Sequence, residues 1–339
     1  MMKTIVCEEP HRFVLREAPE PEPGKDEALL RVRRIGICGT DLHAYCGNQP
    51  FFTYPRVLGH ELSGEIAEIN SDGTGLRQDD AVVIIPYLAC GRCAACRKGR
   101  TNCCAALRLI GIHQDGGMAE YISMPVSHLI RAEGLKLEQM AIVECLSIGA
   151  HAVRRAQVQP GQTVLVIGAG PIGMGAMQFA RIAGARVIAL DINDDRLAYC
   201  NNALRVDVCL NAGDSDIKGR IAELTYGEFP DVVMEATGNP QSMMNAFKFV
   251  AHAGTYVLVS VVKADITFED PEFHKREITL LSSRNATRED LERVIQAIQR
   301  GEVQTDSFIT HRVGFDNMID TFDSWLDPAS GVIKAVVEL

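Results

Sequence analysis

The sequence predicts an α/β protein with two unlike parts, and three observations support this. Of the 339 residues, 47% are hydrophobic and 23% are charged, a balance typical of a chain with a large buried core. Up to about residue 126, short β-branched segments are separated by Gly, Pro and charged turns, which predicts an irregular, mostly antiparallel β domain. From Pro160 onward, apolar strands and helical segments alternate, which predicts right-handed βαβ units and a parallel sheet.

The individual elements follow from these patterns. In the first part we expect strands at 28–36 and 81–86, followed by a helical region at 137–156. In the second part the expected strands are 163–167, 186–190, 206–210, 231–235 and 254–259. The expected helices between and after them are 172–183, 194–204, 216–226 and 241–250. Two later helical patterns (288–300 and 316–325) and a strand (332–338) do not continue the alternation, so the tail either extends the second domain or returns to the first.

Charge and cysteine usage exclude several classes of protein. Lys and Arg number 34 against 44 Asp and Glu, and the resulting net charge of −10 disfavours a nucleic-acid partner. The N-terminus becomes acidic at Glu8 and Glu9 before any apolar segment develops, which is unlike a secretory signal. The most apolar window, 164–180, holds four glycines and a proline, so we expect no membrane span. Eleven cysteines without a signal indicate thiols or metal ligands in a reducing compartment, and we expect a cytoplasmic protein.

A glycine-rich segment directly follows the expected strand at 163–167. It consists of Gly168, Ala169, Gly170, Pro171, Ile172 and Gly173. Such glycines allow a tight turn and close approach to a pyrophosphate, and the N-terminus of the next helix favours the phosphate charge. Asp191 ends the following strand, where its carboxylate would accept hydrogen bonds from ribose hydroxyls and repel a 2′-phosphate, so NAD is favoured over NADP. Arg196 either lies along the adenine ring or is a solvated helix charge.

Four cysteines have the spacing of metal ligands. They are Cys90, Cys93, Cys96 and Cys104, in the pattern C-x-x-C-x-x-C-x₇-C. Four thiolates in one short loop suit tetrahedral zinc in a closed, structural site, and an iron–sulfur cluster is the chemical alternative.

A second set of possible ligands is dispersed along the chain. Cys38, the pair His60 and Glu61, and Glu144 would supply the thiolate, imidazole and carboxylate donors of a catalytic zinc with an open position. Each residue also has an ordinary interpretation, since single cysteines are usually buried in a core and a His-Glu pair usually lies on the surface. A glutamate at the start of a helical segment is often only a favourable partner of the helix dipole.

At these motifs the chain resembles the zinc-dependent medium-chain dehydrogenase/reductase family, the group that contains alcohol, sorbitol and threonine dehydrogenases. The matching segments follow in order: 36–43, 59–64, the cysteine quartet, 115–121, Glu144 and 168–173. The resemblance implies a GroES-like catalytic domain over 1–150, with a structural zinc lobe at about 88–106. It further implies a doubly wound Rossmann NAD-binding domain over 151–284 and a return of the chain to the catalytic domain over 285–339.

The resemblance also implies two zinc ions per chain and their ligands. Cys38, His60 and Glu61 would bind the catalytic zinc, and Glu144 would be a fourth ligand or would hold the zinc-bound water. The structural zinc would be bound by Cys90, Cys93, Cys96 and Cys104, which leaves Cys103 as a bystander. One departure from the family is Cys145, which stands where a proline usually follows the acid.

The implied activity is NAD-linked oxidation of a secondary hydroxyl, in which zinc acts as a Lewis acid and the nicotinamide accepts the hydride. Thr40 and His43 fall where the family carries the released proton to water. The resemblance also implies a homo-oligomer, either a dimer or a tetramer, acting on a small molecule. The alternatives are a polyol or threonine dehydrogenase and a non-catalytic regulatory protein that binds zinc and NAD.

Four stretches outside the metal and nucleotide motifs bear on the substrate. Residues 48–60, 110–117, 270–275 and 282–287 resemble the bacterial L-galactonate oxidoreductases, which act on a sugar acid. The expected reaction is therefore oxidation of L-galactonate to a keto-uronate. Because a substrate carboxylate is best bound by a bidentate guanidinium, the candidates are Arg56 and Arg284, with Asn285 or His113 contacting hydroxyls. In the alternative interpretation, Arg284 and Asn285 contact the nicotinamide or only the domain interface.

Overall fold

A computed structural model describes residues 1–49 and 52–339, which divide into two compact units. Unit 1 comprises Met1–Glu144, Thr287–Gly301 and Thr305–Leu339, and unit 2 comprises Cys145–Ala286 and Glu302–Gln304. Pro50 and Phe51, which belong to the 48–60 stretch, lie outside the described residues. Within the described ranges, no helix combines the length and apolarity needed to cross a membrane.

Unit 1 is built mainly on β-sheets. Its strands are β1 (Met2–Glu9), β2 (Arg12–Ala18), β3 (Glu27–Ile37), β4 (Arg56–Val57), β5 (Glu61–Asn70), β6 (Ala81–Ile84), β7 (Tyr87–Leu88), β8 (Arg108–Leu109), β9 (Tyr121–Pro125), β10 (Leu129–Arg131), β17 (Ile309–Gly314) and β18 (Lys334–Glu338). The largest sheet has the order β10-β6-β5-β3-β18-β17, with β9 also paired to β3. Two smaller sheets have the orders β2-β1-β4 and β7-β8.

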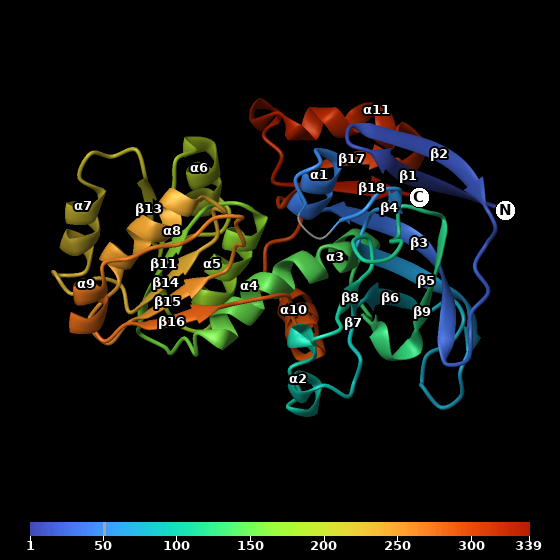
Figure 1. Cartoon of the computed structure of the whole chain (residues 1–339), viewed down its shortest axis with the longest axis horizontal. Coiled ribbons are helices and arrows are strands. Elements are labelled where there is room, and N and C mark those ends of the chain that lie inside the picture. The colour runs from blue at the N-terminus through green and yellow to red at the C-terminus, as the bar shows by residue number, and fades with distance from the viewer. Residues whose placement is uncertain (50–51) are drawn as a thin grey trace. The chain divides into compact units, whose positions relative to one another are not determined.

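The C-terminal strands of unit 1 complete its largest sheet. β18 pairs antiparallel with the second half of β3 and parallel with β17. One sheet of unit 1 therefore contains strands that precede unit 2 in the sequence and strands that follow it. Figure 1 shows the red strands β17 and β18 beside the blue N-terminal strands. The return of the tail to the N-terminal sheet buries apolar side chains from both segments, among them Leu30, Ile35, Ile66 and Phe322.

The helices of unit 1 are short. They are α1 (Gly39–Tyr45), α2 (Ala94–Arg97), α3 (Leu137–Ala141), α10 (Arg288–Gln299) and α11 (Met318–Phe322). The helix α4 (Val143–Arg155) begins in unit 1 and continues into unit 2. Leu137–Arg155 is therefore two helices separated at Ile142, rather than one helical region, and Glu144 lies in the first turn of the second helix.

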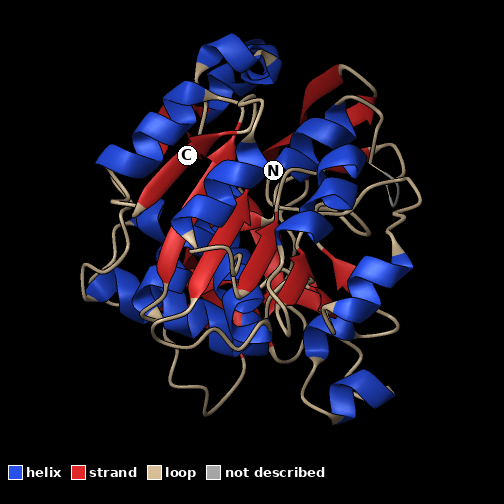
Figure 2. Ribbon diagram, turned by 90° about the vertical axis from the view of Figure 1, so that its left-hand side faces the viewer, coloured by secondary structure: helices blue, strands red, loops and turns tan. Residues whose placement is uncertain are grey.

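Unit 2 is a six-stranded parallel sheet with helices packed on it. Its strands are β11 (Thr163–Ile167), β12 (Arg186–Asp191), β13 (Val208–Asn211), β14 (Val232–Glu235), β15 (Thr255–Leu258) and β16 (Thr279–Ser282). Their order, β13-β12-β11-β14-β15-β16, is that of a doubly wound dinucleotide-binding sheet. The helices are α5 (Pro171–Ile182), α6 (Asp194–Asn202), α7 (Ile217–Leu224), α8 (Pro240–Ala246) and α9 (Asp270–Lys275). Figure 2 shows helices flanking these strands.

The fold class predicted from the sequence is confirmed, and the alternation from 163 to 259 matches the observed strands and helices to within a few residues. After residue 259 three elements were not predicted: α9, the strand β16 that extends the parallel sheet, and β17, which falls in a segment that the sequence pattern left as a polar stretch. In unit 1, α1, α2 and most of the short strands were not predicted individually. β16 and β17 carry several exposed residues, so the apolar alternation that marks a strand is weak in both.

Candidate functional site

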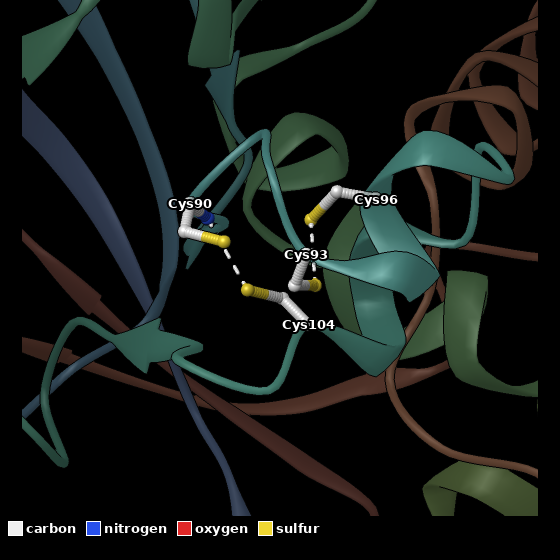
Figure 3. Close-up of side chains that lie close together, drawn as sticks. All are labelled: Cys90, Cys93, Cys96 and Cys104. Carbon is white, nitrogen blue, oxygen red and sulfur yellow. Dashed lines mark hydrogen bonds between the residues drawn. The ribbon is translucent and has the colours of Figure 1, made fainter.

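The cysteine quartet forms a compact cluster in unit 1. The sulfur atoms of Cys90, Cys93, Cys96 and Cys104 all lie within 4.8 Å of one another. Figure 3 shows the four side chains turned toward a common centre, with Cys96 on α2. The cluster starts two residues after β7 and ends four residues before β8, so the pairing of these two strands closes the loop that carries it.

The chemistry of this cluster fits a bound cation. Backbone N–H groups of Cys96 and Ala105 lower the pKa of Cys93 to about 6, which favours the thiolate. Desolvation and the neighbouring thiols of Cys93 and Cys104 raise the pKa of Cys96 to about 12. Four adjacent thiols with such opposed pKa values cannot all ionise together unless a cation compensates the charge, and zinc accepts four thiolates in a tetrahedron.

The dispersed set of ligands also comes together in unit 1. Cys38 lies between β3 and α1, and His60 and Glu61 lie at the start of β5, whose pairing with β3 brings the two segments side by side. One ligand atom from each of the three lies within 4.8 Å of the others. Gly36 pairs with Glu61, and a side chain there would collide with the Glu61 carboxylate, so the glycine is required for this packing.

Asp41 links the two ligand-bearing segments and was not predicted from the sequence. It is fully buried, and its carboxylate accepts hydrogen bonds from the N–H of Cys38 at 2.9 Å and of Gly59 at 3.2 Å. Its Oδ1 lies 3.7 Å from Nδ1 of His60, an atom that is buried without a hydrogen-bond partner. A carboxylate behind a histidine nitrogen is the usual arrangement that orients the ring toward a metal. Burial opposes the charged imidazole, but Asp41 and Cys38 outweigh it and raise the pKa of His60.

Lys334 is the second residue that sequence analysis missed. This lysine on β18 is 1% exposed, and its Nζ donates to both carboxylate oxygens of Glu61 at 2.8 Å and to the Ile37 carbonyl at 2.9 Å. Its signal in the sequence was a single lysine in the otherwise apolar segment 332–337. A buried cation on Glu61 compensates one carboxylate of the site and ties the last strand to the ligand cluster.

Glu144 is not one of the three residues whose ligand atoms lie within 4.8 Å of one another; it lies in the first turn of α4, where it interacts electrostatically with His60 and Glu61. It is 5% exposed, and burial raises its pKa to about 7. The hydroxyl of Tyr87, a third residue that was not predicted, donates a hydrogen bond to its Oε1. The half-buried Cys38 and the buried His60, Glu61 and Glu144 thus offer sulfur, nitrogen and oxygen donors. They include more carboxylates than Lys334 alone balances, and this set fits a zinc ion.

The residues predicted to carry the proton and those predicted to bind the substrate lie in different parts of the chain. Thr40 and His43 both lie on α1, immediately after Cys38, and His43 is exposed. Arg56 is held by Asp115 at 3.2 Å and by Thr53 at 3.2 Å, so its guanidinium is already paired. The ring of His113 accepts a hydrogen bond from the Leu109 N–H at 3.0 Å.

Arg284 and Asn285 belong to unit 2, between β16 and α10. Arg284 is exposed, and Asn285 has a left-handed backbone with φ of 52°. Since Arg56 and His113 belong to unit 1, the four substrate candidates are divided between the two units.

The glycine-rich turn of unit 2 has the local geometry of a dinucleotide site. Gly168 has φ of 99°, and a Cβ there would lie 2.9 Å from the Ala236 carbonyl carbon. A side chain at Gly173 would collide with the Gly168 carbonyl, whereas Gly170 faces open space at the N-terminus of α5. Close backbone neighbours therefore exclude a side chain at Gly168 and Gly173. Gly170 faces open space, where its backbone can approach a pyrophosphate.

Asp191 lies beside this turn, at the end of β12. Its carboxylate accepts hydrogen bonds from the N–H groups of Ala169 and Asn193, so it is fixed against the glycine-rich segment. Pro171 and Ile172 begin α5, and Arg196 lies in the first turn of α6. Ile192, next to Asp191, is 78% exposed.

Comparison with known proteins agrees with the description of unit 1 and with that of unit 2. Residues 24–134 match the family model of the alcohol dehydrogenase GroES-like domain, and residues 171–300 match that of the zinc-binding dehydrogenases. The chain is 41% identical to an L-galactonate-5-dehydrogenase of Escherichia coli K12, covering 99% of this chain and 98% of that protein. It is 31% identical to a sorbitol dehydrogenase of Halalkalibacterium halodurans, covering 95% and 93% of the two chains.

A solved structure of RspB from Escherichia coli CFT073, complexed with NADH, superposes with a TM-score of 0.94 at 27% identity and covers 100% of this chain and 99% of that one. The same fold therefore holds a nicotinamide dinucleotide in a related protein. Taken with the two family models, these relatives confirm the resemblance found in the sequence: the chain belongs to the zinc-dependent alcohol dehydrogenases, and it is an oxidoreductase that uses zinc and NAD.

Proposed function

We propose that this oxidoreductase oxidises a secondary hydroxyl of L-galactonate to a keto-uronate, as an L-galactonate 5-dehydrogenase does. The observation that supports this choice of substrate is the 41% identity, over nearly the whole of both chains, to the Escherichia coli enzyme of that name. In the balanced reaction, the carbinol carbon gives a hydride to NAD⁺ and the hydroxyl gives a proton to water, so that a C=O bond forms.

In this proposal the buried cluster of unit 1 binds the catalytic zinc through Cys38, His60 and Glu61, with Glu144 as a further ligand or as the group that orients the zinc's remaining ligand. The zinc supplies Lewis acidity, which lowers the pKa of the substrate hydroxyl. Thr40 and His43 on α1 transfer the released proton to solvent, a role supported by their position next to Cys38 and by the exposure of His43. Asp41 keeps the His60 ring oriented.

Unit 2 binds the NAD in this proposal. Gly168, Gly170 and Gly173 allow the pyrophosphate to approach the N-terminus of α5, where Pro171 and Ile172 form the first turn. Asp191 accepts hydrogen bonds from the ribose hydroxyls of the adenosine, and Arg196 lies against the adenine.

The four cysteines bind a second, structural zinc. This assignment is supported by their mutual distances of at most 4.8 Å and by the opposed pKa shifts of Cys93 and Cys96. A closed four-thiolate site has no position for a substrate, so its effect is on stability.

The substrate carboxylate is assigned to Arg284, with Asn285 or His113 contacting sugar hydroxyls. Arg284 is preferred over Arg56 because its side chain is the more exposed of the two. A bidentate guanidinium–carboxylate pair is strong, so Arg284→Ala is expected to raise KM for a sugar acid about tenfold or more and to leave a neutral polyol nearly unaffected. Equal effects on both substrates would remove Arg284 from this role.

The decisive experiment measures NADH formation with L-galactonate, D-sorbitol, L-threonine and a simple secondary alcohol, each before and after treatment with a chelator. Turnover restricted to L-galactonate and abolished by chelation is the expected result. Preference for D-sorbitol would instead favour a polyol dehydrogenase, the activity named for the Halalkalibacterium relative. No NADH with any of the four would contradict the proposed substrate.

The chain is also proposed to act as a homo-oligomer, a dimer or tetramer. β16 is the outer strand of the parallel sheet, and its Leu280 is 39% exposed, so the sheet presents a free edge that a second copy could extend. Light scattering of the purified protein tests this, and a monomer at all concentrations would refute it.

We place the protein in the cytoplasm. All eleven cysteines are free thiols, and the four clustered ones have to stay reduced to bind metal. Fractionation of cells that express the tagged chain tests this placement, and recovery outside the cytoplasmic fraction would contradict it.

A further inference from the structure

Tyr87 is held from both sides in the interior of unit 1. It is the first residue of β7 and is 4% exposed. Its backbone pairs with Leu109 on β8, and Nε2 of His128 lies 3.2 Å from its carbonyl oxygen. Since a carbonyl oxygen only accepts, Nε2 of His128 carries the proton and donates it. The ring of Tyr87 is therefore fixed at its backbone end, and its hydroxyl donates to Oε1 of Glu144 at the other end.

The two glutamates of the zinc site thus have partners of different kinds. Glu61 is paired with the cation of Lys334, which contacts both of its oxygens at 2.8 Å. Glu144 accepts a hydrogen bond from the hydroxyl of Tyr87 on one of its oxygens, and the charges of His60 and Lys334 also act on this carboxylate.

We propose that Tyr87 is a positioning residue that acts on the catalytic zinc through Glu144. By binding one carboxylate oxygen, its hydroxyl fixes the orientation in which Glu144 meets the metal or the metal's remaining ligand. This inference rests on the proposed function for its catalytic consequence, but its effect on metal binding does not depend on which substrate the enzyme oxidises.

The substitution Tyr87→Phe removes the hydroxyl and keeps the ring that fills the interior. Groups that hydrogen-bond to metal ligands typically change metal affinity or activity about 10- to 100-fold when removed. We expect zinc to be released from the site at a chelator concentration about tenfold lower, and kcat to fall by about tenfold or more with KM changed much less. Cys38→Ser, which removes a ligand of this site, identifies the release step that belongs to it.

Tyr256→Phe is the matched control. Tyr256 is also fully buried, and its hydroxyl donates to a backbone carbonyl, that of Met243, at 2.8 Å within unit 2. Both variants lose one buried hydroxyl, so a general loss of stability would affect them alike in denaturant unfolding. Earlier zinc release by Tyr87→Phe but not by Tyr256→Phe is the expected outcome, and zinc retention equal to that of the native chain would overturn the proposal.

A double-mutant cycle with Glu144→Gln then tests whether Tyr87 acts through Glu144. Glutamine keeps an acceptor oxygen for Tyr87 but removes the negative charge. If the proposal holds, Tyr87→Phe has little further effect on zinc release in the Glu144→Gln background, because the group that it positions is already altered. Additive effects would show that Tyr87 acts by another route and would refute the proposal.

The two proposals fail in distinguishable ways. If the native chain oxidises none of the four substrates but Tyr87→Phe still releases zinc early, the proposed substrate is wrong and the role of Tyr87 stands. If the native chain oxidises L-galactonate and Tyr87→Phe keeps both its zinc and its kcat, the proposed function stands and the role of Tyr87 is wrong.

Discussion

The two ligand clusters of unit 1 are assembled in opposite ways. The cysteine cluster takes four ligands of one kind from 90–104, inside one loop closed by β7 and β8. The other cluster takes ligands of different kinds from 38, 60 and 61, with Glu144 close by, and places a buried carboxylate, hydroxyl and ammonium around them. The first can stabilise a loop with little apolar content, whereas the second requires most of the unit to be folded before its ligands meet. Loss of a single ligand is therefore expected to lower mainly stability at the first cluster and mainly turnover at the second.

The largest effect that this comparison predicts is on turnover. Cys38→Ala removes a proposed zinc ligand, and because metal-ion catalysis contributes several kcal/mol, kcat is expected to fall by about three powers of ten or more. The free energy of unfolding changes much less. Steady-state kinetics and denaturant unfolding of the same preparation separate the two quantities.

Cys46→Ala serves as the control for this change, since Cys46 caps the other end of the same short helix and is not part of the cluster. Unchanged turnover in Cys38→Ala would mean that the dispersed cluster is not the catalytic site.

The next largest effect concerns the buried ion pair. Lys334→Met leaves Glu61 charged and unpaired in the interior, and breaking such a pair typically costs about 3–5 kcal/mol of unfolding free energy. The control is Lys3→Met, which breaks an ion pair of similar length, 2.7 Å to Asp316, between side chains that are 46% and 67% exposed. Exposed pairs contribute at most about 1 kcal/mol. Equal losses in the two variants, measured by urea unfolding, would show that burial of Lys334 has no special weight.

A smaller effect is expected at the cysteine cluster. Cys96→Ser removes one of the four thiolates, and we expect a loss of about 2–3 kcal/mol, in the upper range for single substitutions. That loss corresponds to a melting temperature lower by roughly 5–10 °C for a domain of this size. Cys103→Ser, at the exposed neighbouring thiol, is expected to change nothing. If Cys96→Ser abolished turnover at a temperature where the chain stays folded, the division of roles between the clusters would be wrong.

The same contrast explains how much of the site the sequence could predict. The cysteine quartet is local, so its spacing alone indicated a metal, and the glycine-rich turn likewise lies within one strand–turn–helix segment. For the dispersed cluster, spacing offered only a hypothesis, and the family resemblance was needed to join Cys38 to His60 and Glu61. The partners Asp41, Tyr87 and Lys334 went unpredicted because their contacts depend on strand pairing between segments up to 297 residues apart.

The fold was predicted more completely in unit 2 than in unit 1. Unit 2 alternates strand and helix, and its buried parallel strands produce short apolar runs such as 163–167. In unit 1, short strands such as β4 and β7 have two residues each and leave almost no periodic signal. β17 was missed because its inward and outward positions carry threonine, histidine and arginine.

The smallest predicted effect is a pH dependence at His128, which anchors the Tyr87 backbone. Burial lowers the pKa of His128 from its ordinary value of 6.5, although its hydrogen bond to Tyr87 opposes this. The unfolded chain then binds the proton more tightly than the folded one, so this contribution to stability is complete at neutral pH and decreases as the pH falls through about 6.5. Urea unfolding at about pH 7.5, 6.5 and 5.5 measures it.

His128→Gln is expected to flatten this part of the pH profile, while His252→Gln, at an exposed position in unit 2, is expected to leave it unchanged. If the free energy of unfolding of His128→Gln depended on pH as that of the native chain does, another group would be responsible for the loss of stability at acidic pH.

The position of β18 has a consequence for the order in which the chain folds during synthesis. The ribosome releases residues 145–286, and thus all six strands of the parallel sheet, before residues 334–338 exist. Unit 2 can therefore complete its sheet while the second half of β3 still lacks the neighbour that β18 provides, and while Glu61 still lacks its lysine. An unpaired strand edge and an uncompensated buried carboxylate both disfavour the native arrangement. Unit 1 is therefore expected to complete its largest sheet and the buried Glu61–Lys334 pair only after unit 2 has completed its own sheet.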